Sequence, residues 1–474
     1  MKSIKSYLSV IDPRVLRQLS GKPKFFIDIF MSGEFEEEES FIKKICQKGY
    51  SRKYYSSLKM RVLSILEAFV IVSRSYDVSD LQTKMNACQK MFIVGNKLIS
   101  TKDRAEGLRQ IQEAYKIATT YDFVHLACEL SSILYHNYVY YEYNERKANF
   151  YALEVERYLQ DYAAEKKAEY YYFQIIGRIN NSLKSLHFEE SFMKINECKG
   201  QSIKYQVYQS RIEVFYGFSS NNYDLIIKSC EQSLNVFATK KGVYNSYYWF
   251  CFANTAKAYM ALGEYEKAQI NFVKAEDYTS SKSINFGLIQ LHKTLNALHA
   301  SNYPLAYELY LKNRKCRYEN IKEQFAIIEA YLCYLSYTGH LTLNRPFRLG
   351  KLLNETIKAQ TDKEGSNVNI IIAELLVYLG RDRGKFIDRV EAVNSYSYRH
   401  LKSEDSKRAK RFIKILCTLP KVDFHPVALQ RVAKRHIDYL KTHPISMGQN
   451  ISIEILPFEA VLEMIMKQLA RKVA

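Results

Sequence analysis

Histidine and cysteine are the residue types of this chain best suited to hold a metal or to act as nucleophiles, but their spacing favours neither role. The chain has 10 histidines and 9 cysteines, and no two cysteines form a CxxC pair. His425, His436 and His443 share one region, but separations of eleven and seven residues do not match a metal-ligand motif. His292 and His299 lie two turns apart on one predicted helix, which is typical of a helix wall. We therefore expect no metal site.

Motifs for phosphate binding and for hydrolysis are also missing from the sequence. It contains no P-loop, no dinucleotide-binding glycine motif, no HExxH and no GxSxG nucleophile elbow. Glu36 to Glu39 precede a predicted helix, where acidic side chains favour the positive end of the helix dipole. We interpret this run as part of a helix start and not as a catalytic cluster. The prediction is a protein that is not an enzyme and has no cofactor.

The cellular setting is inferred from the cysteines and from hydropathy. The 9 cysteines are an odd number scattered through apolar helical patterns, which is typical of reduced, buried thiols in the cytoplasm. No stretch of about 18 uncharged apolar residues is found, and the N-terminus lacks a small-residue cleavage site. We expect a cytoplasmic protein with no membrane span.

Composition predicts long helices. Hydrophobic residues make up 47 % of the chain, enough for a core, whereas only 8 prolines and 17 glycines are available to mark strands and turns. Between residues 80 and 205, apolar residues recur at spacings of three and four, with Asp122 and Asn144 as natural helix boundaries. The pattern predicts helical hairpins; a different all-helical domain is the alternative for this region.

One segment has a more specific pattern of two helices around a turn. Small and aromatic residues recur at helical spacing on both sides of Gly263 and Tyr265, at Phe252, Ala256, Tyr259, Ala268, Phe272 and Ala275. Alanines allow two antiparallel helices to approach closely, and the rings fill the gaps toward the next pair. This segment resembles a tetratricopeptide (TPR) repeat.

Two neighbouring segments match the same pattern less closely. One has Tyr303, Ala306 and Tyr310, with Pro304 at the start of a helix; the other has Tyr223, Ile226, Cys230 and Ser233. The anchor tyrosines are 42 and 38 residues apart, longer than the roughly 34 of an ideal repeat. We therefore predict an all-α fold, an α-α superhelix that forms a TPR-like solenoid of antiparallel helical hairpins with an atypical C-terminal cap.

The TPR resemblance implies a concave groove that binds peptides or helices of partner proteins. The chain is accordingly predicted to be a non-enzymatic scaffold or adaptor for protein–protein interaction. Candidate groove residues are polar positions on the first helix of each hairpin that packing does not use. They are Asn254, Lys257, Lys293 and Asn296.

The predicted division of the chain is residues 1–75, 76–380 and 381–474. In the first part, a helix ending near Gln47 is followed by a glycine turn and by a second helix that Ser51 caps. This outline suits a helix-turn-helix that enters DNA, in a peptide-sensing regulator, or simply a helical hairpin with a solvated basic face. The basic face of the second helix consists of Arg52, Lys53, Lys59 and Arg61.

The third part contains the strongest charge. Residues 381–441 contain sixteen Lys or Arg and seven Asp or Glu, a net charge of +9 out of +19 for the chain. One helix here is expected to turn its basic residues to water. Such a face suits ordinary solvation, docking of an acidic protein or lipid surface, or contacts with nucleic acid within a larger complex. The residues concerned are Lys407, Arg408, Lys410 and Arg411.

Residues 451–457 alternate apolar and polar side chains and are expected to form a short extended segment. An isolated strand cannot satisfy its own backbone groups. We expect this segment to be tucked along the last helices or paired with another chain.

Overall fold

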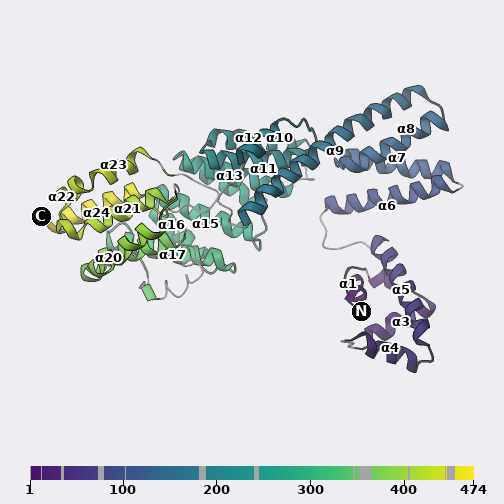
Figure 1. Ribbon diagram of the computed structural model, residues 1–474, viewed down its shortest axis with the longest axis horizontal. Coiled ribbons are helices and arrows are strands. Elements are labelled where there is room, and N and C mark those ends of the chain that lie inside the picture. The colour runs from purple at the N-terminus through teal and green to yellow at the C-terminus, as the bar shows by residue number, and fades with distance from the viewer. Residues whose placement is uncertain are drawn as a thin grey trace. The chain divides into compact units, whose positions relative to one another are not determined.

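A computed structural model gives the structure of the chain (Figure 1). It describes residues 2–11, 13–33, 37–72, 80–101, 103–180, 188–239, 245–344, 347–350, 352, 366–403, 406–443, 445 and 454–473. The described residues form 23 α-helices and one short 3-10 helix, with no strand among them. The expected all-α class is confirmed. Helices that follow one another in the chain pack together as hairpins, which is consistent with a helical repeat array.

Two compact units divide the chain. One contains residues 1–166 and 199–205, and the other contains residues 167–198 and 206–474. The boundaries after residues 75 and 380 stay predictions.

The first unit begins with a small group of helices around an aromatic core. The rings of Phe26, Phe41 and Tyr55 contact one another in this core. The helices are α1 (Lys2–Val10), α2 (Pro13–Leu16), α3 (Gly21–Met31), α4 (Glu38–Gln47) and α5 (Arg52–Val72).

The turn between α4 and α5 is as the sequence predicts. Gly49 has a φ of 87°, a backbone conformation that favours glycine. The Tyr54 amide donates to Ser51 Oγ at 3.2 Å, which confirms Ser51 as the cap of α5. Residues 34–36 of the acidic run lie outside the described residues.

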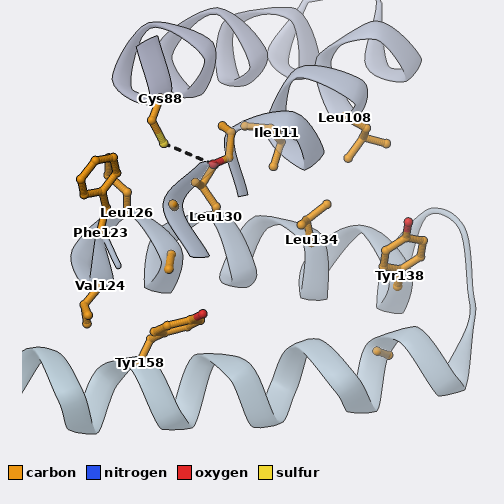
Figure 2. Close-up of a cluster of buried hydrophobic side chains, with 14 residues drawn as sticks. Cys88, Leu108, Ile111, Phe123, Val124, Leu126, Leu130, Leu134, Tyr138 and Tyr158 are labelled. Carbon is orange, nitrogen blue, oxygen red and sulfur yellow. Dashed lines mark hydrogen bonds between the residues drawn. The ribbon is translucent and has the colours of Figure 1, made fainter. Parts of the chain in front are cut away.

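A second core of the first unit lies among α6 (Asp80–Ser100), α7 (Arg104–Thr120), α8 (Val124–Tyr140) and the start of α9 (Glu145–Asn180). Figure 2 shows Leu130 and Leu134 on α8 between the neighbouring helices, with Cys88 Sγ donating to the Ala114 carbonyl at 3.2 Å. The helix boundary predicted at Asn144 is confirmed, because its Oδ1 accepts from the Lys147 amide at 3.0 Å.

The hairpins with TPR-like spacing lie in the second unit. Ala256 on α13 and Ala268 on α14 are fully buried, and the two helices pack against each other. Gly263 between them has a φ of 77°, which explains the glycine at this turn. The hairpin predicted from this spacing is confirmed. The helices of this region are α10 (Phe188–Asn196), α11 (Ile203–Ser220), α12 (Tyr223–Ala238), α13 (Asn245–Ala261), α14 (Tyr265–Asp277), α15 (Ile284–His299), α16 (Tyr303–Asn313) and α17 (Glu319–Tyr337).

The remaining helices complete the C-terminal end of the second unit. They are α19 (Ser366–Arg381), α20 (Arg383–His400), α21 (Lys407–Thr418), the 3-10 helix η2 (Pro420–Val422), α22 (Pro426–Val432), α23 (Lys434–Thr442) and α24 (Phe458–Val473). The rings of Phe412 on α21 and Phe458 on α24 stack with their centroids 4.4 Å apart. This contact fastens the last helix to α21.

The extended segment expected at residues 451–457 is only partly described. Residues 451–453 lie outside the described residues, and Glu454 to Pro457 form no strand, which corrects the expected β-like character of this part. The expected tucked position holds, because Glu454, Ile455 and Leu456 are buried. This part is therefore held by side-chain packing and not by a ladder of backbone hydrogen bonds.

Candidate functional site

Three of the four predicted groove residues take part in packing, contrary to the expectation that packing does not use them. Asn254, Lys293 and Asn296 are all buried. Asn254 is 5 % exposed, and its Nδ2 donates to the carbonyl of Phe250 on the same helix at 2.8 Å. The role of these three residues in binding a partner stays a prediction.

The two buried residues on α15 link this helix to α14. Lys293 Nζ lies 2.9 Å from Glu276 Oε2, and Gln290, one turn earlier, donates to the other oxygen of Glu276. Asn296 Nδ2 donates to the Tyr265 carbonyl at 3.0 Å. These polar positions therefore stabilise the junction between successive hairpins.

Lys257, the fourth predicted groove residue, lies in a different environment. Its side chain is partly buried, and its Nζ is 4.8 Å from the centre of the Phe218 ring on α11. It also lies near His292 on α15 and Cys230 on α12, and it forms no ion pair with any described residue. Burial lowers the pKa of Lys257 to about 8, and the nearby Cys230 thiol opposes this. A largely desolvated ammonium without a carboxylate is rare in folded proteins.

A second basic side chain, that of Arg211, also lies close to aromatic rings. The guanidinium of Arg211 on α11 lies 5.2 to 5.5 Å from three ring centres, those of Tyr172, Tyr247 and Phe250. Cation–π contacts of this kind hold a charge without neutralising it. In chain order, α13 and α15 each open a hairpin with the helix that follows, and Gly217 on α11 lies close to Ile226 on α12. We call four side chains of α11, α13 and α15 the first-helix wall: Arg211, Phe218, Lys257 and His292.

The two histidines of α15 are structural. Burial lowers the pKa of His292 to about 3, with Lys257 adding to the effect, and its ring is parallel to that of Phe272 at 6.1 Å. Burial lowers the pKa of His299 to about 4, and its Nε2 makes a 2.9 Å hydrogen bond with the Glu454 carbonyl oxygen. Both rings therefore stay neutral near pH 7. This agrees with the prediction that they belong to a helix wall.

The basic face expected on α21 is turned partly inward, which corrects the water-facing arrangement predicted for Arg408. The Arg408 side chain is only 12 % exposed and lies 2.5 Å from Glu454 Oε1 and 2.8 Å from Glu459 Oε1. It also donates to the carbonyls of Leu440 and His443. The amphipathic pattern of α21 did not reveal this buried ion pair. Arg408 is on the polar side of the helix, but it faces Glu454, which lies 46 residues later in the sequence.

The neighbours of Arg408 on α21 are engaged to different degrees. Lys410 Nζ donates to a backbone carbonyl at 3.0 Å. The guanidinium of Arg411 lies 5.1 Å from the ring centre of Tyr439. Lys407 is the exposed member of the set. The four positions therefore do not form one continuous surface for an anionic partner.

The predicted basic face of α5 is likewise divided. Arg52 lies 2.9 Å from Glu39, and Lys59 lies 2.6 Å from Glu38, so the acidic start of α4 partly neutralises α5. Hydrogen bonds from Lys59 and then from Tyr55 hold the pKa of Glu38 below its usual range. These contacts explain why acidic residues open α4.

The other two members of this face are available to solvent. Lys53 and Arg61 are exposed and form no ion pair with a described residue. Their part in DNA contact stays a prediction.

Sequence reasoning missed a cavity of about 440 Å³ between the end of α16 and the first turns of α17. Its lining includes Arg314, Lys315, Cys316 and Arg317 from the connection between the helices, and Lys322 from α17. The sequence signal for this cavity was the run of basic residues at the end of α16 and directly after it. A basic run in a connection is common on protein surfaces, so the sequence alone did not single it out.

A buried acidic cluster in the first unit was also missed. Asp122 Oδ2 accepts from the Ile203 amide at 2.6 Å, and Asp161 Oδ1 accepts from the Gln201 amide at 2.7 Å, so both fix the start of α11. Glu165 near them is 3 % exposed, and burial raises its pKa to about 7. Asp161 and Glu165 share α9, but Asp122 and the bound amides lie elsewhere in the sequence, so no local motif reveals the cluster.

Metal and membrane sites are not found in the described part of the chain. No group of three His, Cys, Asp or Glu side chains there is arranged to hold a metal ion. His425 instead caps α22, with Nδ1 accepting from the Ala428 amide at 3.4 Å, and the His443 ring stacks on Tyr439 with centroids 3.9 Å apart. None of the described helices combines the length and the apolar character needed to cross a bilayer.

Comparisons with known proteins give no family: no protein-family model matches the sequence, and no curated protein is significantly similar to it. What the protein does is therefore inferred from its own residues.

Proposed function

We propose that this protein is a non-enzymatic adaptor that binds a segment of a partner protein on the first-helix wall of a TPR-like superhelical array. The consecutive packing of α12 to α17 supports an array of this kind. TPR-like arrays place the first helices of successive hairpins along the concave side, which is where Lys257 would meet a partner. We place the adaptor in the cytoplasm.

The observation that carries the proposal is that no described carboxylate pairs with Lys257. Burying an ammonium costs free energy that a nearby carboxylate normally offsets. Glu276 on α14 is already bonded to Lys293 and Gln290. A partner carboxylate would supply the missing charge. The Phe218 ring beside Lys257 is only 2 % exposed, so it holds the lysine and does not meet the partner. The partner segment is therefore expected to be acidic.

Affinity purification from the native cells tests the proposal. The full chain, its Lys257→Met variant and its Lys228→Met variant are compared, each with and without nuclease treatment. Lys228 is an exposed residue of α12, so its variant removes the same charge from a second helix. We expect a small set of proteins to survive nuclease with the full chain and with Lys228→Met, and to be lost with Lys257→Met.

Circular dichroism of each variant shows whether it folds, so that a lost partner is not mistaken for a lost fold. Recovery of nucleic acid alone would overturn the adaptor proposal. If Lys257→Met folds and still recovers the full set of partner proteins, Lys257 is not part of the binding surface.

The alternative, a nucleic-acid-binding regulator, retains one supporting observation. Lys53 and Arg61 on α5 are exposed cations without a carboxylate partner among the described residues. Phosphate contacts make binding fall steeply as salt rises, by about one power of the salt concentration for each contact. Gel-shift titrations of a labelled duplex and a labelled single strand at about 50 and about 200 mM salt distinguish the two functions. An adaptor should bind neither with a steep salt dependence.

A further inference from the structure

The cavity between α16 and α17 has a strongly basic rim. Tyr310, Phe325 and Ala326 also line it, but these side chains are nearly covered by their neighbours. Its volume of about 440 Å³ falls in the range of small-molecule sites, roughly 300 to 1,000 Å³. The cavity therefore has room for more than a single carboxylate. The charged side chains that line it are Arg314, Lys315, Arg317 and Lys322, with the acids Glu319 and Glu329.

The basic rim is short of partners within the described part of the chain. Glu319 is 3.6 Å from Lys322, so these two charges offset each other. Arg317 donates to a neighbouring tyrosine hydroxyl, and neither it, Arg314 nor Lys315 forms an ion pair with a described residue. The Nε of Arg314 is buried without a hydrogen-bond acceptor among the described residues. The Arg314 side chain therefore has no hydrogen-bond or ion-pair partner among the described residues.

The surrounding fold holds the rim in a defined position. Tyr318, directly before α17, donates from its hydroxyl to the Lys282 carbonyl at 2.7 Å, which ties the connection to the segment before α15. A Cβ on Gly287 of α15 would lie 2.8 Å from Ile321 Cδ1 and 3.3 Å from Cys316 Sγ, so the connection packs closely on α15. A site fixed by packing binds a ligand with little ordering cost.

We propose that this cavity binds a small molecule that carries phosphate groups. The Arg314 guanidinium suits bidentate contact with phosphate oxygens, and Lys315 and Arg317 add charge from the same connection. This site lies on different side chains from the first-helix wall, so it goes beyond the adaptor function and does not depend on it.

Protection of Cys316 from alkylation tests this proposal on the full chain. The reaction of each cysteine with iodoacetamide is followed by mass spectrometry in the presence of pyrophosphate, of ADP, or of sodium chloride at matched ionic strength. We expect both phosphate probes to slow alkylation of Cys316 and sodium chloride to have no effect. Cys46, an exposed thiol of the first unit, should react at an unchanged rate. Equilibrium dialysis with labelled ADP gives the same comparison if Cys316 reacts too slowly to follow.

Two matched variants make the result specific. Arg314→Gln should weaken ADP binding about tenfold or more, because a charge-assisted contact is lost. Lys312→Gln, which removes an exposed charge on α16 outside the cavity lining, should leave it unchanged.

Two outcomes would overturn the proposal: neither probe protects Cys316 or binds in dialysis, or Arg314→Gln retains full binding. A glutamate-rich peptide is the last probe. Protection by this peptide and not by ADP would assign the cavity to a protein partner instead.

Discussion

Arg408 in the C-terminal region and Lys257 on the first-helix wall are both cations removed from water, but their surroundings are opposite. Arg408 contacts two carboxylates and two carbonyls, and it joins α21 to the segment before α24. Lys257 contacts a ring and lies near a neutral histidine and a thiol. A paired buried charge holds the surrounding segments in place. A buried charge without a carboxylate is destabilising, and a ligand that brings a carboxylate would bind favourably there.

The pKa directions follow the same contrast. At Glu454 burial raises the pKa, and the hydrogen bond and charge of Arg408 act in the opposite direction. At Lys257 burial lowers the pKa to about 8, with only a thiol opposing it. The dense C-terminal charge in the sequence therefore serves in part to hold the fold. A single lysine in an otherwise ordinary helix is the better candidate for recognition.

Removing Arg408 should have the largest effect. Arg408→Met removes the cation that faces the buried Glu454, and we expect a loss of about 3 to 5 kcal/mol in the free energy of unfolding at pH 7. Urea denaturation measures it. Arg435→Met on α23 makes the same replacement at an exposed position and should change stability by no more than about 0.5 kcal/mol. Similar small effects in both variants would show that the buried ion pair of Arg408 contributes nothing to stability.

Glu165 extends the comparison to a buried acid, with the next largest effect. Its pKa is about 7 in the folded chain against 4.5 for the free side chain, so between these values the folded state binds the extra proton. Stability should therefore fall as pH rises from 4.5 to about 7, by up to about 3 kcal/mol. Glu165→Gln should lack this fall. Thermal unfolding of both proteins at about pH 5 and pH 8 measures it, and identical pH profiles would contradict the assignment.

Lys257→Met should have a smaller effect, opposite in sign to that of Arg408→Met. Replacing a desolvated ammonium by an apolar side chain of similar length should stabilise the fold by about 1 to 2 kcal/mol at pH 7, because some solvent contact moderates the burial. In the unaltered chain the folded state releases the Lys257 proton near pH 8, before the unfolded state does near 10.5. Stability should therefore rise across that window.

Urea denaturation of the unaltered chain and of Lys257→Met between about pH 7 and pH 10 checks this rise. The variant should lack the component of the pH dependence that Lys257 contributes. A destabilised variant would show that Lys257 is held by favourable contacts within the fold, and the comparison with Arg408 would then lose its basis.

The exposed pair of Arg52 and Glu39 should have the smallest effect. Both side chains are largely exposed, at 70 % and 48 %. Water and salt screen such a pair, so Arg52→Gln should cost no more than about 1 kcal/mol, and less at high salt. Denaturation at two salt concentrations measures it. A larger loss of stability that does not depend on salt would show that this surface pair stabilises the fold as strongly as the buried pair of Arg408.

Local sequence was sufficient for the hairpins that follow the TPR-like pattern. The spacing of Ala256, Ala268 and Phe272 predicted helices that bury these residues, and Gly263 and Ser51 marked a turn and a cap where the structure has them. These features depend on residues within one or two turns of each other. Helical periodicity and backbone preferences act at that range, so the chain reveals them directly.

What lay beyond the sequence were contacts between distant segments. Arg408 and Glu454 meet across 46 positions, and Asp122 reaches Ile203 across 81. The burial of Lys293 likewise depends on how closely neighbouring hairpins pack. An amphipathic pattern shows that a polar side chain lies away from its own helix's apolar stripe, but not whether another helix covers that side. The sequence determined the helices and their pairing into hairpins, and only the tertiary structure decided which charges are buried, paired or left for a partner.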